Sequence, residues 1–363
     1  MKSIPLVDLR AAHAEVADEV ADGFARVIAR TAFVGGDEVA AFEREYASFG
    51  GVGHCVGVAN GTDALELALR AVGVGPGDEV VIPANTFVAT AEAVARTGAR
   101  SVPVDVDPAT YLMDTGAALA AVTPTTRAIV PVHLYGQLVD VAPLRAGGVP
   151  VVEDAAQCQG ATAGGRGAGS EGIAATSFYP GKNLGAYGDA GAVVTDDADL
   201  ATAVRTLGNH GGLRKYVHDV VGVNSRLDGL QAVVLRAKLA RLGAWNEARR
   251  AAAARYDELL AGLDVVRPVT APGNVHVWHL YVVRVPARRD EVLGKLNADG
   301  IGAGIHYPVP VHLTPAFAHL GYGFGAFPHA ERAATEILSL PIYPQITANQ
   351  QEIVVNALAS ALA

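Results

Sequence analysis

"CVGVANGTDALELALRAVGVGPGDEVVIP", residues 55–83, contains a strand, a helix and a second strand in a single run. Its two ends, 55–59 and 78–83, are short and rich in β-branched residues, which predicts buried strands. Between them, apolar residues recur at the spacing of one helix face: Leu65, Ala68, Leu69 and Val72. Asp63 followed by Glu66 resembles a capping box with aspartate as the cap. Strands that alternate with helices indicate parallel β-strands.

The same alternation continues outward along the chain. Residues 86–97 predict a helix, and β-rich runs follow at 101–106, 128–136, 149–154, 174–180 and 191–196. This order predicts an α/β fold in layers with a mostly parallel central sheet. Ligands of such sheets bind beyond the carboxyl ends of the strands. The loops at 60–63, 153–157 and 179–183 are therefore the candidates for a site.

From about Ser225 onward, the alternation of short strands and helices gives way to long helical stretches. A long helical stretch begins there, with Ser225 and Asp228 as a cap signal. Residues 276–286 are strand-like, and the C-terminus mixes helix and turn. We therefore expect a large domain at 1–244 and a smaller α+β domain at 245–363.

Composition restricts the classes of function. Half of the 363 residues are hydrophobic, which is ample for a sizeable core. The net charge of −9 without a long basic run disfavours nucleic acid as a partner. No apolar run approaches the roughly 18 residues of a membrane span, and Asp8 and Arg10 fall where a signal peptide would be apolar. Cys55 and Cys158 form no metal or disulfide framework, so we expect a cytoplasmic protein without a metal site.

One lysine stands out in "TSFYPGKNLGAYGDAG", residues 176–191. The chain has 28 lysines and arginines, but only five are lysines, and Lys182 lies between glycines. A guanidinium stays protonated, whereas a lysine amine can lose its proton and attack a carbonyl. The alternative is an ordinary solvated charge on a loop.

Two polar side chains follow the strand predicted at 149–154. Asp154 sits where the strand should end, and its carboxylate could point into the ligand crevice or cap the following turn. Gln157 lies one helical turn further on, so both side chains can face the same ligand.

Two other loops could hold a phosphate and a planar ring. The backbone N–H groups of the 60–63 loop open a helix, which suits a phosphate, and Ser177 could donate its hydroxyl to the same group. Phe87 could present a ring face to a cofactor, although a core aromatic is the commoner role. Pyridoxal 5'-phosphate needs this set of groups: a lysine, an acid, a phosphate cradle and a stacking ring. The lysine holds the cofactor's aldehyde as a Schiff base, and the acid pairs with its pyridine nitrogen.

The sequence also resembles the sugar aminotransferases of the DegT/DnrJ/EryC1/StrS family, which have the type I aspartate-aminotransferase fold. The resemblance extends over nearly the whole chain, in order and spacing. The matching stretches are 42–51, 58–90, 127–137, 151–161, 177–195, 222–232, 305–313 and 340–344.

The resemblance implies a role for each cofactor residue. Lys182 would be the Schiff-base lysine and proton shuttle, Asp154 would contact the pyridine nitrogen, and Gln157 would lie near the cofactor hydroxyl. The residues implied to hold the phosphate or stack on the ring are Gly61, Thr62, Ser177 and Phe87. Asn224 matches a residue that reaches the phosphate of the neighbouring subunit, which implies a homodimer with shared active sites. The alternative for Asn224 is a helix cap.

The implied reaction moves an amino group from an amino acid, usually L-glutamate, to a keto group of a nucleotide-linked hexose. Residues 60–71 and 215–231 are most similar to the subgroup that acts at C3 of dTDP-3-keto-6-deoxyhexoses. The candidate substrate contacts are Lys215, Tyr216, His218, His306 and Tyr307; for the histidines, a packed or surface imidazole is the alternative.

Several alternatives stay open or are set aside. The acceptor could be a 4-keto sugar, and a regulator of the same fold could keep the cofactor. The family often has an arginine where this chain has Gly208, which bears on substrate preference. Gly167, Gly169 and Gly172 spell a dinucleotide motif, but they precede a predicted strand instead of following one, which argues against a nicotinamide oxidoreductase.

Overall fold

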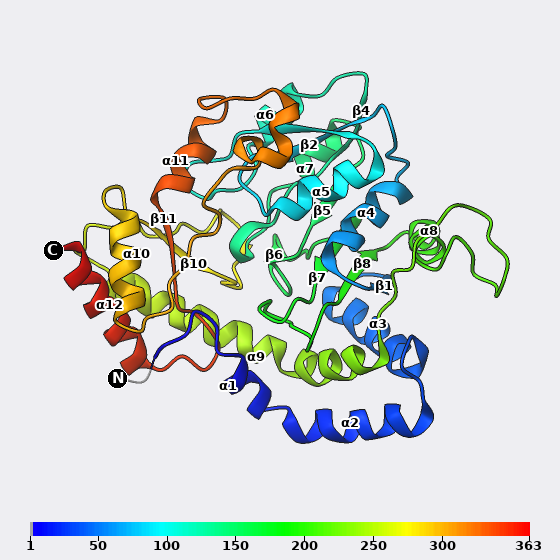
Figure 1. Cartoon of the computed structure of the whole chain (residues 1–363), viewed down its shortest axis with the longest axis horizontal. Coiled ribbons are helices and arrows are strands. Elements are labelled where there is room, and N and C mark those ends of the chain that lie inside the picture. Colours follow the sequence, from blue (N-terminus) through cyan, green and yellow to red (C-terminus); the bar gives the residue numbers. More distant parts are fainter. Residues whose placement is uncertain (1–2) are drawn as a thin grey trace.

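A computed structural model describes residues 3–363 (Figure 1). Its centre is a β-sheet built from a four-stranded part, β1-β8-β7-β5, and a three-stranded part, β4-β2-β3. Parallel bridges from Ile129 to Val151 and from Val132 to Asp154 join the two parts. The strands are β1 (His54–Val58), β8 (Gly191–Thr195), β7 (Ile173–Ser177), β5 (Val152–Asp154), β4 (Thr126–Ile129), β2 (Glu79–Pro83) and β3 (Arg100–Val104).

The sheet is mostly parallel, which confirms the prediction, with one reversed strand. β5 runs parallel to β7, and β2 runs parallel to both β3 and β4. β8 is antiparallel to both of its neighbours, β1 and β7. The chain returns from β7 to β8 through the loop 178–190 without a crossover helix, and a short return of this kind reverses the strand direction.

Helices cover both faces of the sheet (Figure 1). Alternate residues of β7 point to opposite sides, as the pleat requires: Ile173 and Ala175 pack on one side with α4 (Gly61–Ala71) and α5 (Val88–Thr97), and Ala174 packs on the other with α3 (Gly36–Gly50) and α9 (Gly229–Leu259). The result is a three-layer α/β body whose sheet is buried on both faces.

The helix predicted after β1 is present, but its cap differs from the prediction. Asn60 is the N-cap, and its side chain accepts a hydrogen bond from the backbone N–H of Asp63 at 2.8 Å. The Asp63 carboxylate pairs instead with Arg96 on α5, at 3.0 Å. The predicted capping box of Asp63 and Glu66 was therefore wrong, because the helix begins at Gly61 and Asn60 caps it.

The long helix α9 links the two ends of the molecule. It begins at Gly229, and Asp228 at its N-cap makes no side-chain cap hydrogen bond, so the predicted cap signal is not used. α9 packs against α2 (Ala17–Arg30), α3 and α12 (Ala348–Leu362). Since residue 244 falls inside this helix, we propose the 1–244 and 245–363 domains as two bodies that share one helix.

The C-terminal part has its own core. β10 (Tyr281–Arg284) pairs antiparallel with β11 (Ile337–Leu340), and α10 (Arg289–Ala298) and α12 cover this pair. The remaining elements are α1 (Leu9–Ala14), α6 (Thr115–Ala120), α7 (Ala142–Ala146), β6 (Thr162–Ala163), α8 (Ala198–Gly208), β9 (Asn274–Val275), α11 (Pro328–Glu336) and the 3-10 turns Leu134–Gly136, Val311–Leu313 and Pro315–Leu320.

None of the helices within residues 3–363 combines the length and the apolar character that crossing a membrane requires. Over the same residues, histidine, cysteine, aspartate and glutamate side chains form no group of three or more that could hold a metal ion.

Candidate active site

The three candidate loops follow strands that point the same way. β1 and β7 are each antiparallel to β8, and β5 is parallel to β7, so the carboxyl ends of β1, β5 and β7 lie at one edge of the sheet. The start of α4, the turn after Asp154 and the loop with Lys182 follow these ends directly. The edge therefore brings together residues from Gly61 to Lys182 that are far apart in the sequence.

Lys182 occupies the loop between β7 and β8. Its backbone N–H donates to the carbonyl of Tyr179 at 2.8 Å, which folds the loop tightly around it. Burial lowers the pKa of the Lys182 amine to about 8, and the nearby carboxylate of Asp154 acts in the opposite direction. The amine therefore loses its proton far more readily than a surface lysine, as a nucleophile requires.

Asp154 ends β5 and is only 5% exposed. One carboxylate oxygen accepts a hydrogen bond from the hydroxyl of Thr90 at 2.8 Å, and the other accepts one from the backbone N–H of Ala156 at 3.1 Å. Burial raises the pKa of Asp154, and these two hydrogen bonds and the charge of Lys182 oppose the rise. Ion pairs within residues 3–363 do not include Asp154, so this carboxylate would gain from a cationic partner such as a protonated pyridine nitrogen.

Gln157 is held in a fixed orientation one turn further on. Its amide oxygen accepts from the backbone N–H of Tyr135 at 2.7 Å, and its amide nitrogen donates to the Tyr307 hydroxyl at 3.0 Å. The Tyr307 ring lies 5.3 Å from the ring of Phe87. Phe87 is 51% exposed at the N-cap of α5, so it is not a core aromatic and its ring can meet a planar ligand.

Gly61 and Ser177 form a close-fitting cradle. A Cβ added to Gly61 would lie 2.5 Å from Cβ of Ser177 and 3.0 Å from its hydroxyl oxygen, so only glycine fits here. Gly61 and Thr62 open α4, where the first N–H groups of a helix have no partner within the helix. These N–H groups and the Ser177 hydroxyl suit a phosphate.

His306 and Tyr307, which the sequence analysis gives as candidate substrate contacts, lie in this cluster. The His306 imidazole lies 2.8 Å from the hydroxyl of Ser339, and its carbonyl accepts a hydrogen bond from the hydroxyl of Tyr135. Burial, aided by the charge of Lys182, lowers the pKa of His306 to about 4. The imidazole is therefore neutral at neutral pH and can donate or accept a hydrogen bond.

The other candidate substrate residues lie elsewhere in the chain. Lys215, Tyr216 and His218 are on the loop after α8, which projects from the body (Figure 1). Tyr216 is 83% exposed, and the Lys215 amine lies 5.0 Å from its ring centre. Within one chain this loop does not join the Lys182 cluster.

Asn224 ends the same loop and is also exposed. Its side-chain oxygen accepts a hydrogen bond from Arg226 at 3.0 Å. Because α9 begins at Gly229, Asn224 does not cap this helix. An exposed amide at this position is free to meet a second subunit.

Two side chains of the site were not identified from the sequence. Thr90 supports Asp154 and is itself 2.8 Å from the hydroxyl of Thr86, and the i, i+4 spacing of these threonines was the available signal. His279 is buried beside Asn183, with its Nδ1 3.2 Å from the Asn183 oxygen, and burial together with Lys182 keeps its pKa well below the usual value. No local pattern around His279 indicates this contact.

The residues present fit pyridoxal phosphate. Asp154 offers a buried carboxylate that lacks a cation, the cradle at Gly61 excludes any larger side chain, and Lys182 offers an amine of lowered pKa. Pyridoxal phosphate carries the three groups that these residues would bind: a cationic ring nitrogen for Asp154, a phosphate for the Gly61 cradle and an aldehyde for Lys182.

Sequence comparisons with known proteins point to aminotransferases, as the residues of the site do. The model of the DegT/DnrJ/EryC1/StrS aminotransferase family matches residues 15–359. The chain is 48% identical over 362 residues, 98% of this chain and 95% of the relative, to dTDP-3-amino-3,4,6-trideoxy-alpha-D-glucose transaminase of Streptomyces venezuelae. It is 45% identical over 365 residues, 98% of each chain, to a protein of Geobacillus stearothermophilus named pleiotropic regulatory protein.

Solved structures of related proteins have the same fold. S. venezuelae DesV in complex with a ketimine intermediate superposes with a TM-score of 0.97, at 46% identity, covering 100% of this chain and 99% of that one. The ntda protein of Bacillus subtilis, with bound cofactor PMP, superposes with a TM-score of 0.92, at 32% identity, covering 100% of this chain and 86% of that one. The type I aminotransferase fold expected from the sequence is therefore confirmed.

Proposed function

The chain belongs to the DegT/DnrJ/EryC1/StrS aminotransferase family, and we propose that it transfers the amino group of L-glutamate to C3 of a dTDP-linked 3-keto-6-deoxyhexose. It is a pyridoxal-phosphate-dependent nucleotide-sugar aminotransferase. The S. venezuelae transaminase, whose name gives a 3-amino dTDP sugar, supports C3 and dTDP for this chain. The stretches 60–71 and 215–231 support the same subgroup.

The observation that carries the proposal is Lys182 beside Asp154. When bound, pyridoxal phosphate supplies an aldehyde and a protonated ring that withdraws electrons. We assign to the Lys182 amine the attachment of the cofactor and the removal of the proton from Cα of the amino donor. We assign to Asp154 the retention of the proton on the ring nitrogen, and to Gln157 the orientation of the cofactor hydroxyl.

Other residues of the cluster would bind and orient. Gly61, Thr62 and Ser177 would hold the phosphate, and Phe87 would lie on the ring. His306 and Tyr307 would contact the sugar, because both lie beside Lys182 and Asp154 and neither is charged at neutral pH. We also propose a cytoplasmic location, which the two buried free cysteines support.

The choice of acceptor is tested in a single half-reaction. The enzyme is first converted with L-glutamate to its pyridoxamine form and freed of donor. We expect dTDP-3-keto-6-deoxyhexose to restore the aldehyde spectrum and the 4-keto isomer to leave it unchanged. Restoration by the 4-keto isomer alone would reassign the acceptor, and no restoration by either would overturn the proposed dTDP-linked acceptor. Failure of L-glutamate to form the pyridoxamine form at all would favour a regulator that retains the cofactor, as the name of the Geobacillus relative suggests.

We further propose a homodimer in which Asn224 of each chain reaches the partner's phosphate. Asn224 is exposed, and the loop before it carries apolar side chains that a partner would cover: Leu213, Tyr216, Val220 and Val221, all more than half exposed. Lys215, Tyr216 and His218 on this loop would then face the partner's site. This would explain why they lie outside the cluster in their own chain.

Mixing two inactive variants tests the shared site. In a hybrid of Lys182→Ala with Asn224→Ala, a crossed arrangement puts both lesions in one site and leaves the other site intact. We expect activity to recover after subunit exchange, towards half the wild-type value per hybrid dimer. Each variant incubated alone through the same exchange is the control. Verified hybrids without recovered activity would show that Asn224 serves its own chain.

A further inference from the structure

Lys238 of α9 is a buried cation to which the proposed function gives no role. It is only 4% exposed, although lysine is rarely buried without a charged partner. Within residues 3–363, no aspartate or glutamate forms an ion pair with it. Its amino group instead donates a hydrogen bond to the backbone carbonyl of Gly185 at 2.6 Å and lies 4.7 Å from the centre of the Tyr187 ring. Both contacts belong to the loop between β7 and β8 that carries Lys182.

Lys238 is one of three polar side chains of α9 that hold this loop. The side chain of Gln231 accepts a hydrogen bond from the backbone N–H of Tyr187 at 2.9 Å, and that of Asn246 accepts one from the side chain of Asn183 at 3.0 Å. The three are seven and eight residues apart in the sequence, about two helical turns each, so they lie along one face of α9. Their partners occupy every second position from Asn183 to Tyr187, so this segment is attached to the helix along one side.

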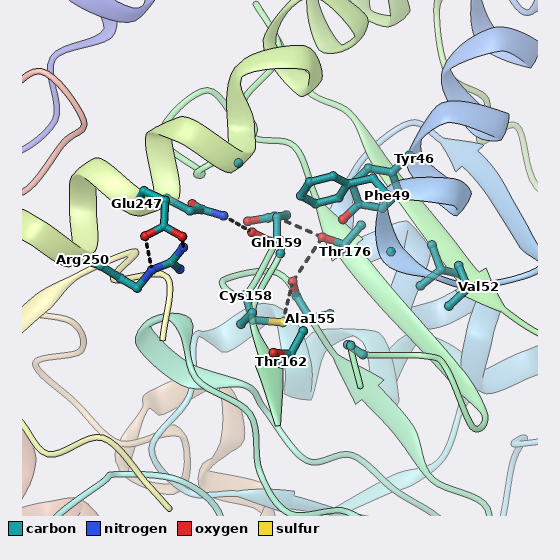
Figure 2. A pocket seen from close by; sticks show the side chains of 18 residues that line it. Tyr46, Phe49, Val52, Ala155, Cys158, Gln159, Thr162, Thr176, Glu247 and Arg250 are labelled. Atoms are coloured by element: carbon teal, nitrogen blue, oxygen red, sulfur yellow. Dashed lines mark hydrogen bonds and ion pairs between the residues drawn. The ribbon is translucent and has the colours of Figure 1, made fainter. Parts of the chain in front are cut away.

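The start of the loop is held at the end of β7. The side chain of Gln159 donates to the Thr176 hydroxyl at 3.1 Å and to the Ser177 carbonyl at 2.8 Å. Asn246 donates in turn to the backbone carbonyl of Gln159 at 2.9 Å. Figure 2 shows Gln159 between Thr176 and α9, beside a cavity of about 360 Å³ that β7 and α9 both line. The loop therefore has one fixed end at β7 and one fixed side along α9, and Lys182 lies between them.

The position of the Gly185 carbonyl is coupled to that of Lys182. The loop doubles back on itself, since a Cβ added to Gly185 would lie 2.3 Å from the carbonyl oxygen of Pro180. The backbone N–H of Ala186 donates to the Phe178 carbonyl at 2.8 Å, which closes the turn around Lys182. Because these residues are in close contact, a displacement of Gly185 displaces the backbone on both sides of Lys182.

We propose that Lys238 is a positioning residue: its amino group holds the Gly185 carbonyl and so keeps the Lys182 amine where the proposed amino-group transfer requires it. This role of Lys238 depends on the function proposed for Lys182. Gly185 is buried, and a buried carbonyl that loses its donor favours a rearranged loop. A misplacement of reacting groups by about 1 Å can slow an enzyme about a hundredfold, so a small shift of the loop is sufficient.

Replacing Lys238 with methionine tests this role, because methionine keeps an unbranched stem and removes the donor. We expect kcat for conversion of the holoenzyme by L-glutamate to the pyridoxamine form to fall at least about tenfold, with KM for L-glutamate changed less than about threefold. Lys238→Gln, whose amide nitrogen falls short of Gly185, should behave in the same way and serves if the methionine variant does not fold. Lys238→Arg, which keeps a donor, should recover most of the loss. A kcat within about twofold of the wild type in the first two variants, or an equal loss in Lys238→Arg, would overturn the proposal.

Arg289→Met is the matched control. Arg289 of α10 is also a buried cation that donates to backbone carbonyls, those of Ala334 and Ile337, at 3.0 and 2.8 Å. Its hydrogen bonds within residues 3–363 all go to the C-terminal part of the chain. We expect both variants to have a lower Tm and only Lys238→Met to have a lower kcat per bound cofactor. Equal losses of kcat in the two variants would reduce Lys238 to a general contribution to stability and overturn the proposal.

Hydrogen exchange in the cofactor-free protein tests the attachment of the loop without the reaction. The peptide with residues 178–190 should exchange at least about tenfold faster in Lys238→Met than in the wild type, and at the wild-type rate in Arg289→Met. Unchanged exchange in Lys238→Met would overturn the proposal whatever its activity. If L-glutamate leaves the wild-type holoenzyme unconverted, the proposed function fails, and hydrogen exchange still decides whether Lys238 holds the loop.

Discussion

Replacing Lys182 with alanine should abolish amino-group transfer, a loss of at least about 10⁴-fold, while the fold stays intact. The reason is chemical, since among residues 3–363 Lys182 is the lysine whose charge acts on the Asp154 carboxylate. Lys182→Arg should fail as well, because a guanidinium keeps its proton and cannot attack an aldehyde. Turnover assays check the activity, and circular dichroism checks the fold. Residual turnover within tenfold of the wild type would remove Lys182 from its assigned role.

A second buried lysine has to be distinguished from Lys182, so the residue that binds the cofactor must be identified chemically. Lys238 is also buried, and burial lowers its pKa to about 8 as well. Its amine, however, donates to the carbonyl of Gly185 at 2.6 Å and lies over the ring of Tyr187. Lowered pKa alone therefore does not distinguish the two lysines, whereas the electrostatic contact with Asp154 belongs to Lys182.

Borohydride treatment of the holoenzyme should fix the cofactor to the peptide that contains Lys182. Peptide mass spectrometry then reads the modified residue directly. In Lys182→Ala no peptide should be modified, and this variant is the control for non-specific reduction. Modification of the Lys238 peptide in the wild type would contradict the assignment.

The sequence could predict the edge of the sheet where the site lies. The spacing of apolar residues at 55–83 reveals strand and helix from the local sequence alone. Parallel strands then place their carboxyl ends at one edge, whatever the loops contain. The loops with Gly61, Asp154 and Lys182 were therefore expected to meet. The strand at 191–196 was predicted but its reversed direction was not, because a buried strand of either direction can be a continuous apolar run.

Contacts between distant side chains account for most of what the sequence could not predict. The bond from Thr90 to Asp154 spans 64 positions, and the short contact of Tyr135 with His306 spans 171. Neither contact leaves a trace in the spacing of neighbouring residues, so a sequence pattern cannot detect it. The prediction of Asp63 as the cap failed for another reason, since asparagine and aspartate are almost equally good caps and the chain offers both, Asn60 and Asp63, within four residues.

The function of the Asp154 carboxylate can be separated from its structural role, because the two predict opposite effects on stability. Burial raises the pKa of Asp154, so the folded protein binds this proton more tightly than the unfolded chain does. Stability of the cofactor-free protein therefore falls as pH rises through the pKa range of Asp154, and at neutral pH the ionised group is destabilising. A neutral amide of the same shape removes this cost.

Asp154→Asn should accordingly lose at least about a hundredfold in turnover, because a charge-assisted contact to the ring nitrogen is removed. The cofactor should still bind, and the Tm of the cofactor-free protein at neutral pH should stay the same or rise. Thr90→Val should give a smaller loss, about tenfold, since the carboxylate remains but loses one hydrogen bond, and Thr90→Ser should restore activity by returning the hydroxyl. Near-normal turnover in Asp154→Asn, together with a lowered Tm, would show that Asp154 only secures the turn through Ala156 and that the ring nitrogen is held by another group.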